Sequence, residues 1–224
     1  MAERPGGKPL GIFGGTFDPV HFGHLRLAEE AADCLDLTGV RWIPSGQPAL
    51  RDTPQVTARQ RLAMVRLAIA ENPTFEVDAS EVDATRPSYT VLTLERLRQA
   101  DQCGRRQPLV LLLGADAFAA LPRWYRWPSL LELAHIGVAH RPGFPIDASR
   151  LPAELAACYG ERYCADRSAL AETPAGRIAS FAMTQLAISA TQIRTLLASG
   201  CSPRYLLPDD VIAYIRSQHL YPEY

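Results

Sequence analysis

The sequence predicts an α/β protein in which a parallel β-sheet carries helices on both faces. Apolar runs of strand length alternate with stretches of helical periodicity along the chain of 224 residues. The run from Leu109 to Leu113 is unbroken, which is typical of a strand buried on both faces of a parallel sheet. Ligands bind such sheets beyond the carboxyl ends of the strands, so residues that follow a strand are the first candidates for a site.

The first predicted element is a strand at residues 10–13, followed by a turn and a helix. Gly14, Gly15 and Thr16 form the predicted turn, and apolar residues then recur at helical spacing up to Leu35. Glycines allow a ligand to approach the backbone closely, and a helix N-terminus attracts anions. This unit therefore predicts a phosphate or nucleotide site.

The later strands and helices alternate in the same way. Thr57 and Gln60 match a capping box, which predicts a helix that ends near Asn72. A turn at residues 86–90 is expected to start a helix through Leu92, Leu94 and Leu97, and further helices are expected at residues 130–134 and, as a terminal pair, after Ser189. Further strands are expected at residues 40–44, 109–113, 136–139 and 177–181, and one more begins at residues 75–77.

The length and the hydrophobic content of 47% predict a single domain. We expect it to cover residues 10–224, with a small C-terminal helical part, after a flexible N-terminal segment at residues 1–9. Residues 143–175 show no clear periodicity, and we treat them as a variable insertion.

The net charge of −1 argues against general adhesion to nucleic acids or membranes, so the expected partners are small molecules. The five cysteines form no C-x-x-C pair, which indicates reduced thiols. We recognise no signal peptide and no membrane span. We therefore expect a cytoplasmic protein that is a monomer or a small homo-oligomer.

His21 and His24 are three positions apart, so both lie on one face at the start of the predicted helix. Gly23 between them leaves room for a large anion, which favours anion binding over simple packing. Zinc is the alternative ligand, but no cysteine or third histidine lies at ligand-like spacing. A dinucleotide-dependent dehydrogenase is disfavoured because no G-x-G-x-x-G follows the first strand.

Two motifs carry a resemblance to a known family. Residues 14–24, GGTFDPVHFGH, and residues 188–194, ISATQIR, resemble the nucleotidyltransferase superfamily marked by an H-x-G-H signature. Within it, the chain is most similar to the bacterial nicotinate-nucleotide adenylyltransferases. The similarity runs from Leu10 to Leu220 and includes Ser88-Tyr89-Thr90, Gly114-Ala115-Asp116, Trp124-Tyr125 and Arg141-Pro142-Gly143. It implies a Rossmann-like sheet.

The resemblance also implies roles for individual residues. It implies a catalytic set of two imidazoles and one guanidinium: His21, His24 and Arg194. It implies that ATP and its phosphates contact residues of both motifs and of the loops: Gly14, Gly15, Thr16, Phe17, Arg51, Asp116, Arg141, Ser189 and Thr191. It implies that three residues hold nicotinate mononucleotide, with stacking on the indole: Thr90, Trp124 and Tyr125.

The residues alone leave other roles open at several of these positions. Asp116 is well placed to cap the helix that follows its strand, and Trp124 with Tyr125 is suited to cover the edge of the sheet. Ser189 and Gln192 match a second capping box, a role that is compatible with phosphate binding.

The chain departs from the family pattern in the loop after the second strand. The family often has Pro-Pro-His followed by a cation, whereas this chain has Leu50 in place of the histidine and Arg51 as the cation. Leu50 is therefore not a candidate site residue. Arg51 stays a candidate phosphate contact, and a solvated loop charge is the alternative.

The resemblance implies that the 5′-phosphate of nicotinate mononucleotide attacks the α-phosphorus of ATP. The products are nicotinate adenine dinucleotide and pyrophosphate, and Mg²⁺ bridges the phosphates with few protein ligands. One alternative is adenylyl or cytidylyl transfer to another phosphorylated small molecule. A nucleotide-binding module without turnover is the alternative from a different class, and the loss of the loop histidine is its only support.

Overall fold

The chain forms a six-stranded β-sheet with the strand order β3-β2-β1-β4-β5-β6. The computed structural model describes residues 7–49, 53–99 and 103–222. The strands are β1 (Leu10–Gly15), β2 (Gly39–Pro44), β3 (Phe75–Val77), β4 (Leu109–Gly114), β5 (His135–His140) and β6 (Ile178–Ala182). β1, β4, β5 and β6 pair in parallel, and the strand order reverses between β1 and β4. This is the doubly wound order, so the predicted fold class is confirmed.

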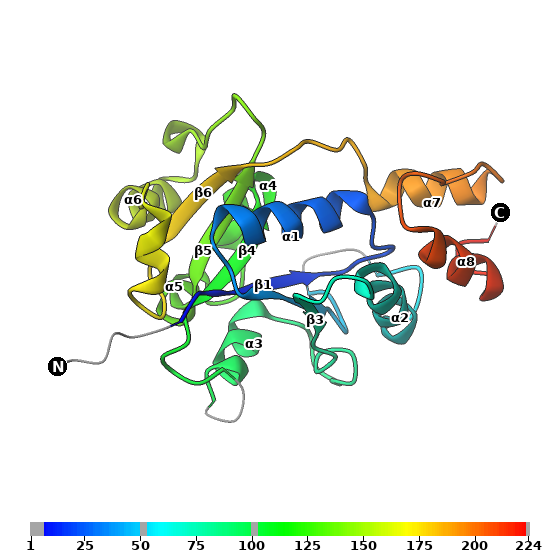
Figure 1. The fold of residues 1–224 in the computed structure, drawn as a ribbon, viewed down its shortest axis with the longest axis horizontal. Helices are drawn as coiled ribbons and strands as arrows, with labels where there is room; N and C mark the ends of the chain where they lie inside the picture. The colour runs from blue at the N-terminus through cyan, green and yellow to red at the C-terminus, as the bar shows by residue number, and fades with distance from the viewer. Residues whose placement is uncertain (1–6, 50–52, 100–102, 223–224) are drawn as a thin grey trace. The chain divides into compact units, whose positions relative to one another are not determined.

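Helices connect the strands along the chain (Figure 1). The α-helices are α1 (Phe22–Cys34), α2 (Ala58–Ile69), α3 (Thr90–Leu97), α4 (Ala115–Ala119), α5 (Leu130–Leu133), α6 (Ala153–Arg162), α7 (Ala190–Ala198) and α8 (Asp209–Ser217). Short 3₁₀ helices lie at η1 (Leu121–Arg123), η2 (Trp127–Ser129), η3 (Ala148–Arg150) and η4 (Arg167–Ala171). Within the described residues, no helix combines the length and the apolar character needed to cross a membrane.

The predicted capping box of α2 is formed in full. The side chain of Thr57 accepts a hydrogen bond from the backbone N–H of Gln60, and the Gln60 side chain accepts one from the Thr57 N–H at 2.9 Å. β3 starts at Phe75 as predicted and ends at Val77, whereas β1 continues two residues past its predicted end, to Gly15. The turn therefore lies after the glycines and not on them.

Helix α6 lies inside residues 143–175, where the sequence showed no periodicity. Its one buried residue is Leu155, and the half-buried Cys158 and Tyr159 follow at positions i+3 and i+4, so its apolar face is only about one turn long. Its N-cap is Pro152, which makes no side-chain cap hydrogen bond, so the usual capping signal is missing.

Contacts between residues divide the chain into two compact units. Unit 1 comprises Met1–Phe13, Ala28–Arg41 and Tyr89–Thr184, and unit 2 comprises Gly14–Leu27, Trp42–Ser88 and Gln185–Tyr224. The single domain at 10–224 remains a prediction. Most of the predicted N-terminal segment, residues 1–6 of 1–9, lies outside the described residues. All five cysteines are free thiols.

Unit 1 has a core built on β4, β5 and β6, which lie side by side in Figure 1. The side chains of Leu109, Val110 and Leu112 in β4 are fully buried, as expected for an unbroken apolar run in a parallel sheet. Arg98 donates hydrogen bonds from the end of α3 to the carbonyl oxygens of Leu133, at 2.7 Å, and Pro174, at 2.8 Å. These bonds satisfy backbone acceptors at the loops that enter the strands.

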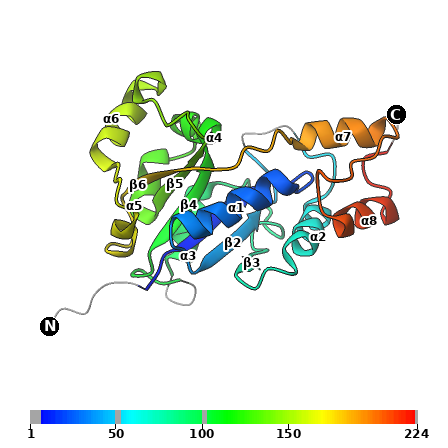
Figure 2. The ribbon, with the colours of Figure 1, turned by 45° about the horizontal axis from the view of Figure 1, so that its top comes forward.

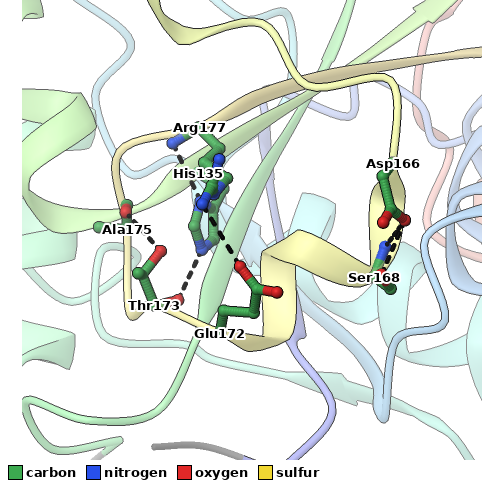
Figure 3. Close-up of polar contacts among 7 residues, drawn as sticks. All are labelled: His135, Asp166, Ser168, Glu172, Thr173, Ala175 and Arg177. Atoms are coloured by element: carbon green, nitrogen blue, oxygen red, sulfur yellow. Dashed lines mark hydrogen bonds and ion pairs between the residues drawn. The ribbon is translucent and has the colours of Figure 1, made fainter.

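His135 connects the start of β5 to the segment before β6 (Figure 3). Its Nδ1 accepts a hydrogen bond from the Arg177 N–H at 3.0 Å, so Nε2 carries the proton and donates to the Thr173 carbonyl at 2.8 Å. The side chain is fully buried, and burial lowers its pKa. His135 is therefore a neutral structural residue.

Unit 2 contains the pair of helices α2 and α8, which pack against each other in Figure 2. Helix α8 buries Val211, Ile212 and Ile215 along one face. The ring of Phe17 packs near the fully buried Trp42, with ring centroids 5.3 Å apart. This packing fixes the turn that follows β1.

Gly137 in β5 is expected to be irreplaceable because a Cβ atom there would overlap its neighbours. It would lie 2.8 Å from Leu35 Cδ1 and 3.0 Å from Val110 Cγ1, both on buried side chains. Overpacking of this kind costs about 1–3 kcal/mol, so Gly137→Ala should lower the free energy of unfolding by that amount in urea titrations.

Gly160 in α6 provides the matched control. A Cβ atom there meets nothing within 4 Å, and Gly160→Ala should raise stability by about 0.5–1 kcal/mol through helix propensity. Equal effects of the two substitutions would contradict the close packing of Gly137.

Candidate active site

The two glycines at the end of β1 have different surroundings. A Cβ atom on Gly14 would meet nothing within 4 Å, so this backbone is open to a ligand. A Cβ atom on Gly15 would lie 2.7 Å from the ring of Phe17, whose side chain is buried. Gly15 therefore serves the packing of Phe17, and Phe17 itself has only backbone atoms to offer a ligand.

His21 and His24 lie together at the start of α1. Their rings are stacked, with centroids 3.8 Å apart and an interplanar angle of 26°. The His21 N–H donates to His24 Nδ1 at 3.3 Å, so Nε2 of His24 carries the ring proton. The His24 ring also meets the Phe17 ring edge-on at 5.1 Å. The predicted pair is thus brought into one cluster with a defined tautomer at His24.

The absence of a side chain at residue 23 allows the two rings to stack. A Cβ atom on Gly23 would lie 3.0 Å from His21 Nδ1 and 3.7 Å from the carbonyl oxygen of Ile188. The second distance shows that the H-x-G-H motif adjoins the start of the ISATQIR motif within unit 2. The two sequence motifs, more than 160 residues apart, therefore meet in space.

Burial keeps His21 neutral. Its side chain is 6% exposed, and burial lowers its pKa from 6.5 to about 4. Its Nδ1 is buried without a hydrogen-bond partner among the described residues. At neutral pH His21 offers a dipole and a hydrogen-bonding ring, but no charge.

Helix α7 presents polar groups at its N-terminal end. Ser189 is the N-cap, and its hydroxyl accepts a hydrogen bond from the Gln192 N–H at 3.1 Å, as the sequence predicted. Ser189 and Thr191 are exposed. Arg194 donates from Nη2 to the Thr191 hydroxyl at 3.3 Å and from Nη1 to the Asp18 carbonyl at 2.7 Å. A positive helix end and a guanidinium thus lie together, which suits a polyphosphate.

Asp18 is the polar centre of unit 2, although the sequence did not mark it as a site residue. Its side chain is 6% exposed. Oδ1 accepts a hydrogen bond from the Tyr221 hydroxyl at 2.6 Å, and Oδ2 accepts one from the Gln55 N–H at 2.9 Å. Oδ2 also lies 3.9 Å from Nη1 of Arg194. Asp18 therefore ties together three segments of unit 2 that are distant in the sequence.

Thr90, Trp124 and Tyr125 lie in unit 1, around the start of α3. Thr90 is the first residue of α3, and its N-cap is Tyr89. The ring of Tyr125 lies 4.8 Å from the ring of Tyr89, which brings the loop after η1 against this helix end. Arg126 strengthens the attachment with an ion pair from Nη2 to Glu95 Oε1 at 2.9 Å. The residues predicted for nicotinate mononucleotide thus share one part of unit 1.

Two further predicted residues of unit 1 follow strands. Asp116 is exposed in the first turn of α4, but the N-cap of that helix is Gly114, so the capping role left open for Asp116 is wrong. Arg141 is exposed after β5. Both lie beyond the carboxyl ends of neighbouring parallel strands, where ligands bind such sheets.

Arg51 and Leu50 lie outside the described residues. Within the described part of the chain, no three His, Cys, Asp or Glu side chains are grouped to hold a metal ion.

Comparison with known proteins places this site in a family. The family model described as cytidylyltransferase-like matches residues 12–196. The chain belongs to this family. A probable nicotinate-nucleotide adenylyltransferase of Dechloromonas aromatica is 63% identical over 214 residues, covering 96% of this chain and 98% of that protein. One of Pseudomonas putida is 48% identical over 221 residues, covering 99% and 98%. The resemblance to bacterial nicotinate-nucleotide adenylyltransferases is therefore confirmed.

A solved structure shares the fold at low sequence identity. The Plasmodium falciparum nicotinic acid mononucleotide adenylyltransferase, complexed with NaAD, matches with a TM-score of 0.70 and 15% identity. The match covers 96% of this chain and 98% of that chain. The two chains therefore share a fold although few of their residues are identical.

Arg61 holds the backbone of the turn after β1 in place, and it was not among the residues predicted from the sequence. It is 1% exposed and donates hydrogen bonds to the carbonyl oxygens of Thr16, at 2.7 Å, and Gly46, at 2.9 Å. Burial lowers its pKa, which the negative charge of Asp18 partly offsets. The sequence does contain a signal for the burial of Arg61. It lies four and eight positions before Val65 and Ile69, which are buried, so it falls on the apolar face of α2.

The buried, neutral His21 should make stability depend on pH in acid. The unfolded chain takes up a proton near pH 6.5 and the folded chain only near pH 4, so stability is lost as the pH falls between these values. From about pH 7.5 to about pH 4.5, His21 should account for a loss of roughly 2 kcal/mol.

The measurement is urea unfolding of the unmodified chain and of His21→Asn at both pH values. Groups such as His135 titrate equally in the two proteins, so the difference isolates His21. The same pH dependence in both proteins would show that His21 is not the buried neutral group.

Proposed function

We propose that this chain transfers the adenylyl group of ATP to nicotinate mononucleotide, forming nicotinate adenine dinucleotide and pyrophosphate in NAD biosynthesis. The observation that carries the proposal is the meeting of the two motifs in unit 2. There the stacked His21 and His24 adjoin Ile188, while Arg194 reaches the turn after β1. The names of relatives with up to 63% identity support the choice of reaction.

The nucleophile needs no general base from the protein. A phosphate monoester has a second pKa of about 6, so the 5′-phosphate of nicotinate mononucleotide is largely a dianion at neutral pH. One of its oxygens bonds to the α-phosphorus of ATP, and the bond from that phosphorus to the bridging oxygen breaks. Pyrophosphate leaves with the electron pair. The protein therefore has to align the two substrates and to stabilise the negative charge on the phosphates and the departing pyrophosphate.

The groups of unit 2 are suited to the phosphates. Nε2–H of His24 is a donor for the phosphate that is transferred, and neutral His21 supports the His24 ring by stacking and through its backbone N–H. Arg194 supplies positive charge, and the hydroxyls of Ser189 and Thr191 supply polar contacts to the triphosphate. Mg²⁺ enters with ATP as part of the substrate and screens the charge of the phosphates.

The groups of unit 1 are suited to recognition of the nucleotides. The indole of Trp124 offers a flat face on which a pyridine ring stacks. Thr90 and Tyr125 are the proposed contacts of the nicotinate carboxylate, and Asp116 and Arg141 are proposed contacts of ATP. The net charge of −1 supports small-molecule substrates over nucleic acid or a membrane, and we infer a monomer or small homo-oligomer in the cytoplasm.

Pyrophosphate release from ATP and Mg²⁺, with nicotinate mononucleotide as the acceptor, tests the proposal. Parallel reactions with nicotinamide mononucleotide and with phosphopantetheine test the acceptor. We expect nicotinate mononucleotide to give the highest kcat/KM. Higher activity with another acceptor, or ATP binding without pyrophosphate release, would overturn the assignment.

His24→Ala should lower kcat by two or more orders of magnitude while the fold stays intact. Loss of one hydrogen-bond donor to the transition state costs about 3 kcal/mol or more, and this side chain is partly accessible rather than part of the core. Steady-state kinetics with circular dichroism of the variant is the measurement. Unchanged turnover would remove His24 from the mechanism.

Trp124→Ala should raise the KM for nicotinate mononucleotide by about tenfold and change the KM for ATP little, because stacking contributes to one substrate only. Trp127→Ala in the following 3₁₀ helix is the matched control, and it should leave both KM values within about twofold. Equal changes for both substrates in Trp124→Ala would contradict the stacking role.

A further inference from the structure

Tyr221 lies near the C-terminal end of the described chain, yet its hydroxyl reaches the turn after β1. It donates to Asp18 Oδ1 at 2.6 Å across 203 positions of sequence. The side chain is 5% exposed, and the backbone has a left-handed φ of 55°. Burial and the contact with Asp18 raise the pKa of Tyr221, so the phenol keeps its proton and remains a donor.

Both oxygens of the Asp18 carboxylate are occupied. Tyr221 holds Oδ1, and the Gln55 N–H holds Oδ2 at 2.9 Å. The guanidinium of Arg194 is the nearby cation, but Nη1 lies 3.9 Å from Oδ2 and 2.7 Å from the carbonyl oxygen of Asp18. Arg194 therefore makes only a long ion pair with the Asp18 carboxylate, and its hydrogen bond goes to the neutral carbonyl oxygen of the same residue.

This arrangement matters because an arginine and a carboxylate form strong, often bidentate ion pairs. An Asp18 side chain released from either donor would be able to close the gap to Arg194. The guanidinium would then be held and largely neutralised by the protein. Its attraction for a polyphosphate would fall accordingly.

We propose that Tyr221 is a positioning residue for ATP: by holding Asp18 Oδ1, it keeps the carboxylate from capturing Arg194 and leaves the guanidinium directed at the triphosphate. This inference rests on the proposed function, in which Arg194 contacts ATP. It assigns the C-terminal segment a role in substrate binding and predicts an effect on one substrate only.

The test compares Tyr221→Phe with Tyr205→Phe. The first substitution retains the buried ring and removes the donor, whereas Tyr205 is 84% exposed and serves as the matched control. We expect Tyr221→Phe to lower kcat/KM for ATP by about tenfold, to weaken ATP binding in calorimetry and to keep the KM for nicotinate mononucleotide within about twofold. Tyr205→Phe should change none of these values.

A double-mutant cycle separates positioning from general support of the fold. Without a cation at residue 194 the carboxylate has nothing to capture, so in an Arg194→Gln background Tyr221→Phe should change kcat/KM for ATP by less than about twofold. Asp18→Asn removes the carboxylate that would capture Arg194, so this substitution should not weaken ATP binding in calorimetry. It serves as the second variant should Tyr221→Phe fail to fold.

Three results would overturn the inference: unchanged ATP binding in Tyr221→Phe, equal changes for both substrates, or the same effect of Tyr221→Phe with and without Arg194. The proposed function fails differently. If the unmodified chain releases no pyrophosphate with nicotinate mononucleotide, the reaction is wrong, while ATP calorimetry on the same variants still decides the role of Tyr221.

Discussion

The burial of one carboxylate governs how unit 2 is assembled. A buried carboxylate requires compensation, and Asp18 obtains it from hydrogen bonds with the Tyr221 hydroxyl and the Gln55 N–H and from a long ion pair with Arg194. Each donor comes from a different segment of the chain. The turn after β1, the loop before α2 and both ends of the C-terminal region are therefore held to a common centre.

A second buried polar group completes this framework. Arg61 spans the carbonyl oxygens of Thr16 and Gly46, so one guanidinium joins the turn after β1 to the loop after β2. The positive charge of Arg61 also offsets the buried charge of Asp18. The polar interior of unit 2 thus fixes the backbone from which His21 and His24 project, and the histidines themselves do not need to be charged.

The buried interior of unit 2 determines which side chains near the site carry charge and which only form hydrogen bonds. Burial keeps His21 neutral, whereas the cation of this cluster is the guanidinium of Arg194. In the proposed reaction, positive charge for the polyphosphate would come from the arginine and the end of α7, and the histidines would contribute shape and a donor of defined tautomer. A neutral His21 is compatible with the proposed reaction, in which the phosphate nucleophile is already ionised and needs no general base.

The sequence by itself determined the parallel α/β fold, the helix caps at Thr57 and Ser189, and the two motifs, because these depend on local periodicity and on spacing over a few residues. It did not reveal α6, which has a short apolar face and no capping side chain at its start, or that Gly15 serves Phe17. Only the tertiary structure decided the partners of Asp18 and Arg61 and the pKa of His21. Hydrogen bonds between segments as distant as Asp18 and Tyr221, and the burial that results, depend on how the chain packs and leave no trace in local sequence.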